Sequence, residues 1–171
     1  MDLTAALLLA LTLSFVVYAI ITLWHVIPWL RTKGRAAALA PLLWVNAFRH
    51  VALQVFSAQR AGLRAPEHLR DQIAYGDVVG MVLAVLALVA LRARARIAIP
   101  LVWLFVVATA EDLVSTLVGG MREGMLGRAS GVTWLILVFY VPALWVTLAL
   151  VVWQLIARRG ETLDSNRTAL R

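Results

Sequence analysis

The segment VNAFRHVALQ, residues 45–54, is a polar insertion within a long apolar stretch of the chain. It contains Arg49, the only one of the 16 basic residues that cannot be placed in a loop or a tail. Moving a guanidinium into hydrocarbon costs about 3 kcal/mol even on the lenient insertion scales, and polar groups at that depth usually face the interior of a helix bundle. We therefore expect the rest of the chain to supply partners for Arg49.

The composition indicates an integral membrane protein. Of the 171 residues, 63% are hydrophobic, and there is no cysteine, which excludes disulfides, thiolate metal sites and thiol chemistry. The net charge of +7 could also suit a nucleic-acid-binding protein. However, the basic residues lie in short clusters between apolar runs, as membrane topology requires. We expect a lipid bilayer as the partner and no nucleic acid.

Five apolar segments are long enough to span a bilayer as helices at about 1.5 Å per residue. They are residues 3–30, 36–58, 73–91, 97–120 and 131–156. They predict an all-α integral membrane protein, with one five-helix transmembrane domain over residues 1–157 and a short cytoplasmic tail over 158–171. Pro66 followed by Glu67 is typical of the first turn of a helix.

The second segment is the least apolar of the five. On a regular helix, Asn46, Arg49, His50 and Gln54 lie in one arc, and apolar side chains occupy the opposite side. This pattern predicts a spanning helix with a protein face and a lipid face, although an amphipathic helix lying on the surface has the same pattern. The distribution of charge favours the spanning helix.

With five spans, the loop and tail basic residues divide ten to five. Ten lie on the side of the C-terminus: Arg31, Lys33, Arg35, Arg92, Arg94, Arg96, Arg158, Arg159, Arg167 and Arg171. Five lie on the other side: Arg60, Arg64, Arg70, Arg122 and Arg128. The positive-inside rule then predicts an external N-terminus and a cytoplasmic C-terminus, in a multi-pass protein of a bacterial-type inner (plasma) membrane.

This topology places the costly polar groups of separate helices at a similar height. The predicted cluster, in the outer half of the bundle, consists of Arg49, His50, Gln54, Asp77, Glu111 and Asp112, with Tyr140 of the fifth segment within reach. The charges of three carboxylates and one guanidinium do not cancel. Unless His50 is charged, at least one carboxyl should be protonated, hydrated or bound to a cation.

The pattern favours a polar pocket that binds a small amphipathic compound or converts it by acid–base chemistry such as isomerisation or hydration. The candidate catalytic residues are His50, Asp77, Glu111 and Asp112. The candidate ligand-binding residues are Asn46, Gln54 and Tyr140, with Arg49 as an anchor for an anion or a carbonyl.

Two alternatives remain open at this point. The cluster could be a structural ion-pair network in an accessory membrane subunit, because an unsatisfied polar group in lipid costs several kcal/mol. It could also conduct protons or cations. The sequence does not decide between an enzyme, a transporter and a subunit, and it does not identify a substrate.

No cofactor is expected from the histidines. His25, His50 and His68 have no metal-ligand spacing, so we expect no dedicated metal site, and only haem with the single axial ligand His50 stays open. Gly76, Gly80 and Ala84 form a stripe of small residues on the third segment. Such a stripe allows close helix approach and predicts a contact surface for a homo-oligomer.

Overall fold

The computed structural model describes residues 2–60, 62–63 and 65–161, and all regular structure in these residues is helical. Five helices are long and apolar enough to cross a membrane: Leu3–Arg31, Arg35–Arg60, Glu67–Arg92, Ala98–Arg122 and Gly131–Ala157. The prediction of five such helices is confirmed. The third begins earlier than its apolar run, at Glu67 directly after Pro66, as the proline and the acid indicate. Arg64, Arg167, Arg171 and the tail from residue 162 lie outside the described residues.

Three of the five long helices change their winding along their length. The first consists of α1 (Leu3–Ile21), the π-helical η1 (Thr22–Val26) and α2 (Ile27–Arg31). The second consists of α3 (Arg35–Ala47), the 3₁₀-helical η2 (Arg49–Gln54) and α4 (Val55–Arg60). The fifth consists of α7 (Gly131–Leu135), the π-helical η4 (Ile136–Tyr140) and α8 (Val141–Ala157).

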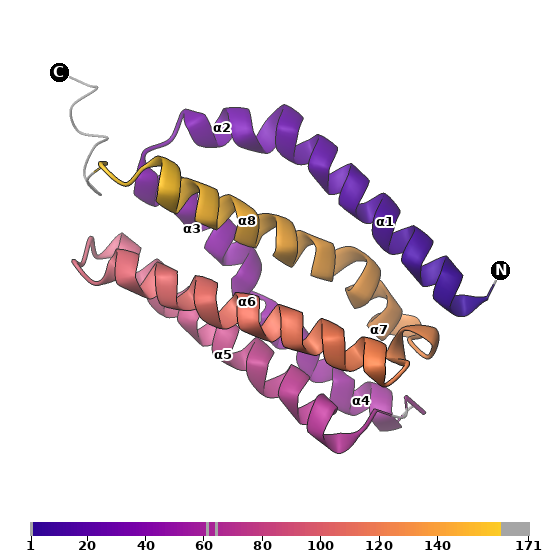
Figure 1. The fold of residues 1–171 in the computed structure, drawn as a ribbon. Helices are drawn as coiled ribbons and strands as arrows, with labels where there is room; N and C mark the ends of the chain where they lie inside the picture. The colour runs from indigo at the N-terminus through magenta and orange to yellow at the C-terminus, as the bar shows by residue number, and fades with distance from the viewer. Residues whose placement is uncertain (1, 61, 64, 162–171) are drawn as a thin grey trace.

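The third and fourth helices, α5 (Glu67–Arg92) and α6 (Ala98–Arg122), are continuous and lie side by side (Figure 1). A short 3₁₀ turn, η3 (Met125–Gly127), follows α6. Helix α5 packs against α6 and α3, and α3 also packs against α8. The main core lies between these four helices, and its fully buried members include Leu39, Leu43, Ala84, Phe105 and Val151.

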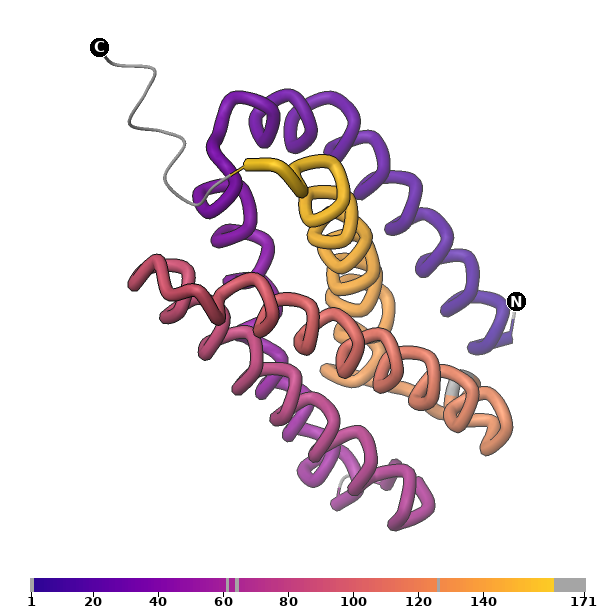
Figure 2. Tube along the Cα trace, turned by 60° about the vertical axis from the view of Figure 1, so that its left-hand side comes forward, coloured from indigo at the N-terminus to yellow at the C-terminus, as the bar shows by residue number. Residues whose placement is uncertain are grey.

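Helix α1 is peripheral. Both views place α8 between α1 and the α5–α6 pair (Figure 2). Only 6% of the most apolar window of the first long helix is buried within the chain, against 33–39% for the other four. In α1 itself Leu7 alone is buried, and most of the remaining large apolar side chains are exposed.

The turns at one end of the bundle are held by arginines. Arg158 donates a hydrogen bond of 2.8 Å to the carbonyl of Leu30 and another to the carbonyl of Lys33. Arg35 donates to the carbonyl of Glu161 at 3.2 Å. The connection between α2 and α3 is thereby fixed to the end of α8. The α5–α6 turn, which carries the second basic cluster, lies at this same end of the bundle (Figure 1).

Candidate functional site

The winding of η2 turns Arg49 inward. After Ala47 the chain changes to i→i+3 hydrogen bonds, and the Val51 amide donates to the Phe48 carbonyl at 3.0 Å. A 3₁₀-helix advances by about 120° per residue, against about 100° in an α-helix. Consecutive side chains therefore point further apart. Arg49 is fully buried and His50 is exposed on the outside of the bundle.

Arg49 joins two other helices through their carboxylates. Its Nε donates to Asp77 Oδ1 of α5 at 2.7 Å, and its Nη2 donates to Asp112 Oδ2 of α6. Side-chain exposure is 0% for Arg49, 15% for Asp77 and 9% for Asp112. Charge-assisted hydrogen bonds of this kind are the strong class, and here they connect three helices that are far apart in sequence. We call these three residues the Arg–Asp–Asp cluster.

Two glycines of α5 make room for this cluster. A Cβ added at Gly80 would lie 2.8 Å from Nη1 of Arg49, and one added at Gly76 would lie 2.5 Å from Cγ of Asp112. Both separations are well inside carbon contact distance. Gly80 and Ala84 are buried in the monomer. The structure therefore does not support the predicted oligomer surface on Gly76, Gly80 and Ala84, because the stripe packs against side chains of its own chain.

Three predicted site residues lie away from the Arg–Asp–Asp cluster. His50 and Glu111 are exposed on the outside of the bundle, although each is next in sequence to a residue of the cluster. Asn46 is fully buried but serves as a helix-to-helix link, because its Nδ2 donates to the Leu42 carbonyl at 3.0 Å and to Thr147 Oγ1 at 3.2 Å. The observed cluster therefore contains Arg49 and two of the three expected acids, and it contains no histidine.

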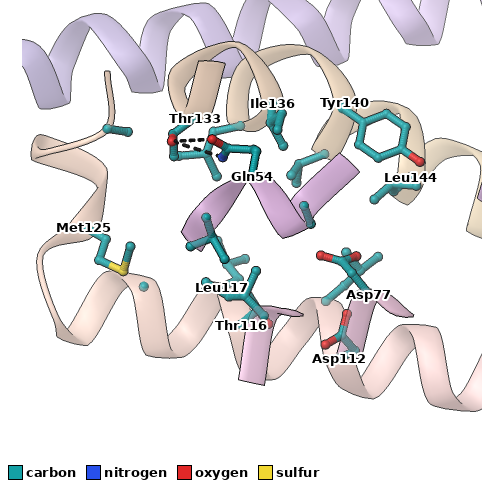
Figure 3. Close-up of a pocket in the computed structure, with 18 of the residues that line it drawn as sticks. Gln54, Asp77, Asp112, Thr116, Leu117, Met125, Thr133, Ile136, Tyr140 and Leu144 are labelled. Atoms are coloured by element: carbon teal, nitrogen blue, oxygen red, sulfur yellow. Dashed lines mark hydrogen bonds between the residues drawn. The ribbon is translucent and has the colours of Figure 1, made fainter. Parts of the chain in front are cut away.

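A cavity of about 130 Å³ adjoins the carboxylates. Figure 3 shows Asp77 and Asp112 at one end of it, with Gln54 and Thr133 further along. Its remaining wall is mainly apolar and includes Ala52, Val55, Leu113, Leu117, Ile136 and Leu144. Arg49 lies behind the two carboxylates and is not part of the wall. The polar groups that reach the cavity from the Arg–Asp–Asp cluster are therefore acidic.

Tyr140 lines the cavity, but its hydroxyl has another partner. The hydroxyl donates to the Val45 carbonyl at 2.8 Å. This bond links η4 to the end of α3. It satisfies a carbonyl near the point where the regular α-helical bonding stops. The tyrosine thus contributes its ring, and not a free hydroxyl, to the cavity wall.

Gln54 and Thr133 separate the cavity from a second, more polar hollow. Gln54 Nε2 donates to Thr133 Oγ1 at 3.1 Å, and the threonine hydroxyl lies 3.4 Å from Gln54 Oε1. Both residues line the apolar cavity and also the hollow, whose wall includes Ser57, Arg128 and Ser130. Sequence reasoning missed Thr133. The available signal was a polar residue in the first turn of the fifth helix, at the height of Gln54.

Thr116 is a second cavity residue that sequence reasoning missed. Its Oγ1 is buried and has no hydrogen-bond partner among the described residues. A buried hydroxyl without a partner costs about 1–3 kcal/mol, so it is a place where a ligand atom or a water can bind. Its position one turn after Asp112 on α6 was the signal in the sequence.

The described residues contain no group of three or more His, Asp or Glu side chains that could hold a metal ion. None of the three histidines lines the cavity. The exposed His50 therefore cannot present an axial ligand to a haem bound there.

The fold and the site define a class: an all-helical protein with five helices long and apolar enough to span a membrane, arranged around a buried ion-pair cluster. The chain belongs to the family described as a domain of unknown function (DUF8737), whose model matches residues 6–156. No curated protein and no solved structure matches the chain.

Proposed function

We propose that the chain is a multi-pass protein of a bacterial-type inner membrane, with its N-terminus outside and its C-terminus in the cytoplasm. The grouping of the basic turns at the end where α8 finishes supports this orientation. The cavity then lies in the outer half of the bundle, between the Arg–Asp–Asp cluster and the loops that follow α4 and α6. Its apolar wall suits a molecule that enters from the bilayer.

We propose that this cavity binds a small amphipathic molecule whose head is a cation or a hydrogen-bond donor. The observation that carries this proposal is the arrangement of charge. Asp77 and Asp112 line the cavity, and their one guanidinium partner lies behind them. Two carboxylates and one guanidinium leave an excess negative charge, so the carboxylate oxygens that line the cavity favour donors.

This proposal changes the role expected for Arg49. Its Nε and Nη2 are bonded to the two carboxylates, and its Nη1 is buried beside Gly80 without a hydrogen-bond partner among the described residues. Because Arg49 does not line the cavity, it holds the carboxylates in place and does not contact the ligand. With His50 outside, any proton transfer would fall to Asp77 and Asp112 alone, so binding is better supported than acid–base conversion.

A proton or cation path is less well supported. Residues 78–110, which form the inner parts of α5 and α6 and the turn between them, contain no Asp or Glu. A path through the bundle needs a chain of such groups or of water-filled space. We therefore take ligand binding as the proposed function and a purely structural ion-pair network as the outcome that would refute it.

Thermal unfolding of the protein in lipid nanodiscs tests the proposal with three probes of one length: hexylamine, hexanol and hexanoate. We expect hexylamine to stabilise most, hexanol less and hexanoate least. At about 100 times its Kd a ligand adds about 2.7 kcal/mol, which corresponds to a rise of roughly 5–10 °C in Tm for a chain of this size.

Two matched variants separate binding in the cavity from partition into lipid. Ala52→Phe places a ring in the cavity and should abolish the effect of hexylamine, whereas Val51→Phe changes the neighbouring exposed residue and should preserve it. Thr116→Ile narrows the cavity from α6 and serves if Ala52→Phe fails to fold. Equal stabilisation by hexylamine and hexanoate, or a full hexylamine effect in the filled variants, would show that the cluster is only structural.

A further inference from the structure

Two ionisable side chains lie on the outside of the bundle at mid-height of their helices. Glu111 is exposed near the middle of α6, and His50 is exposed near the middle of the second long helix. Glu111 has no hydrogen-bond or ion-pair partner among the described residues, and the only polar contact of His50 is its Nδ1 with the Ala47 carbonyl at 3.2 Å. In the proposed membrane topology both would face hydrocarbon, where such groups are expensive.

Helix α1 shows what a lipid-facing helix of this chain looks like. It is exposed along most of its length and has no Asp, Glu, Lys, Arg or His between Leu3 and Trp24. The exposed faces around His50 and Glu111 differ from α1 because each carries an ionisable side chain at mid-height. Around Glu111, the large exposed residues of α6 are all apolar: Trp103, Leu104, Val107, Val114, Leu117, Val118 and Met121. They form one apolar helix face, with Glu111 as its ionisable position, that a second helix can cover.

His50 and Glu111 are held at nearly the same height. His50 follows Arg49 in sequence, and Glu111 precedes Asp112. Because the Arg49 guanidinium is hydrogen-bonded to Asp112, the difference in height between His50 and Glu111 is limited by the combined length of these two side chains. The second and fourth long helices also run in the same direction from the basic end of the bundle. A rotation about the membrane normal conserves height, so it can bring Glu111 of one copy beside His50 of the next.

We propose that copies of this chain associate head to tail, with Glu111 on α6 of one copy against His50 on η2 of its neighbour. The two groups are chemically complementary. A carboxylate accepts a hydrogen bond from an imidazole N–H, and a protonated carboxyl donates one to the unprotonated ring nitrogen. A symmetric pairing of two α6 helices would instead bring two carboxyls together. Such head-to-tail contacts form a ring when the rotation closes. This inference rests on the proposed topology and is independent of the ligand.

The chain has no cysteine, which makes cross-linking direct. Leu53 and Val114 are exposed and lie three residues after His50 and Glu111, one turn further toward the outer side in the proposed topology. A Leu53→Cys chain and a Val114→Cys chain, with different tags, are co-expressed in membranes and oxidised. We expect a covalent dimer that carries both tags. Each variant alone should stay monomeric on a denaturing gel, and so should Val114→Cys paired with Val17→Cys of α1.

The polar contact is tested on the same pair. Adding Glu111→Leu to the Val114→Cys chain should lower the dimer yield about threefold, the effect of one average polar contact in a membrane bundle. The exchange of Glu111→His on one chain and His50→Glu on the other should restore it. A dimer from Val114→Cys alone, no dimer from the mixed pair, or a yield unchanged by Glu111→Leu would each overturn the proposal.

Discussion

Replacing Gly76 with alanine should separate Asp112 from Arg49. The new Cβ would lie 2.5 Å from Cγ of Asp112 and would overlap one of its oxygens, so the carboxylate has to leave its position or α5 and α6 have to move apart. Loss of one partner from a buried ion pair costs about 3–5 kcal/mol. The better helix propensity of alanine returns about 1 kcal/mol. We expect a net loss of about 2–4 kcal/mol in the free energy of unfolding.

Unfolding by a rising mole fraction of SDS in mild detergent micelles, followed by circular dichroism, measures this change. Gly120→Ala is the matched control, because a Cβ at Gly120 meets no atom within 4 Å. That control should be neutral or stabilised by up to about 1 kcal/mol, since it changes only helix propensity.

A double-mutant cycle identifies the cause. In an Asp112→Ala background the carboxylate is gone, so Gly76→Ala should cost almost nothing further. Coupled residues of this kind show interaction energies of about 0.5–3 kcal/mol. Additive losses, or equal effects of Gly76→Ala and Gly120→Ala, would refute the argument that the glycine exists to seat the carboxylate.

Two further predictions concern the same region. Arg49→Met leaves both carboxylates without their cation and should destabilise the fold by about 3–5 kcal/mol, with partial recovery on adding Asp112→Asn, as measured by SDS unfolding; wild-type stability in Arg49→Met would contradict the structural role of the guanidinium. Tyr140→Phe removes the hydrogen bond to the Val45 carbonyl and should cost about 1 kcal/mol without changing hexylamine binding, because the hydroxyl is engaged with that carbonyl. Titration of the variant with hexylamine checks this, and weaker binding at unchanged stability would assign the hydroxyl to the ligand instead.

The number of long helices and most of their limits follow from apolar run length and the charged turns between the runs. The contact of Arg49 with Asp77 and Asp112 can also be predicted from the sequence. The length and direction of each helix give the height of its residues along the bundle, and these three residues have similar heights. Rotation about each helix axis does not follow in the same way. Glu111 and Asp112 are both mid-helix acids about 100° apart, and only the packing of α6 against α5 decides which of them faces inward.

The exclusion of His50 has a specific local cause. The helical arc that grouped Arg49, His50 and Gln54 assumes regular α-helical winding, whereas residues 49–54 form a 3₁₀-helix. The altered rotation per residue adds about 20° to the angle between Arg49 and His50, and because the two carboxylates hold Arg49 inward, His50 lies outside the arc. The cavity was also beyond sequence reasoning, since it depends on how small side chains such as Ala52 and Thr116 leave space when several helices pack.

Biosynthesis has to accommodate the peripheral position of α1. Its main long-range contacts are with η3, η4 and α8, which are the last parts of the bundle to be made. At about 5–20 residues per second, the ribosome needs roughly 5–20 s to pass from the end of α2 to these elements. In the proposed topology α1 spends that interval in the lipid without its native neighbours. Because the segment from Leu3 to Trp24 has no charged side chain, its exposure to lipid during that interval costs little free energy.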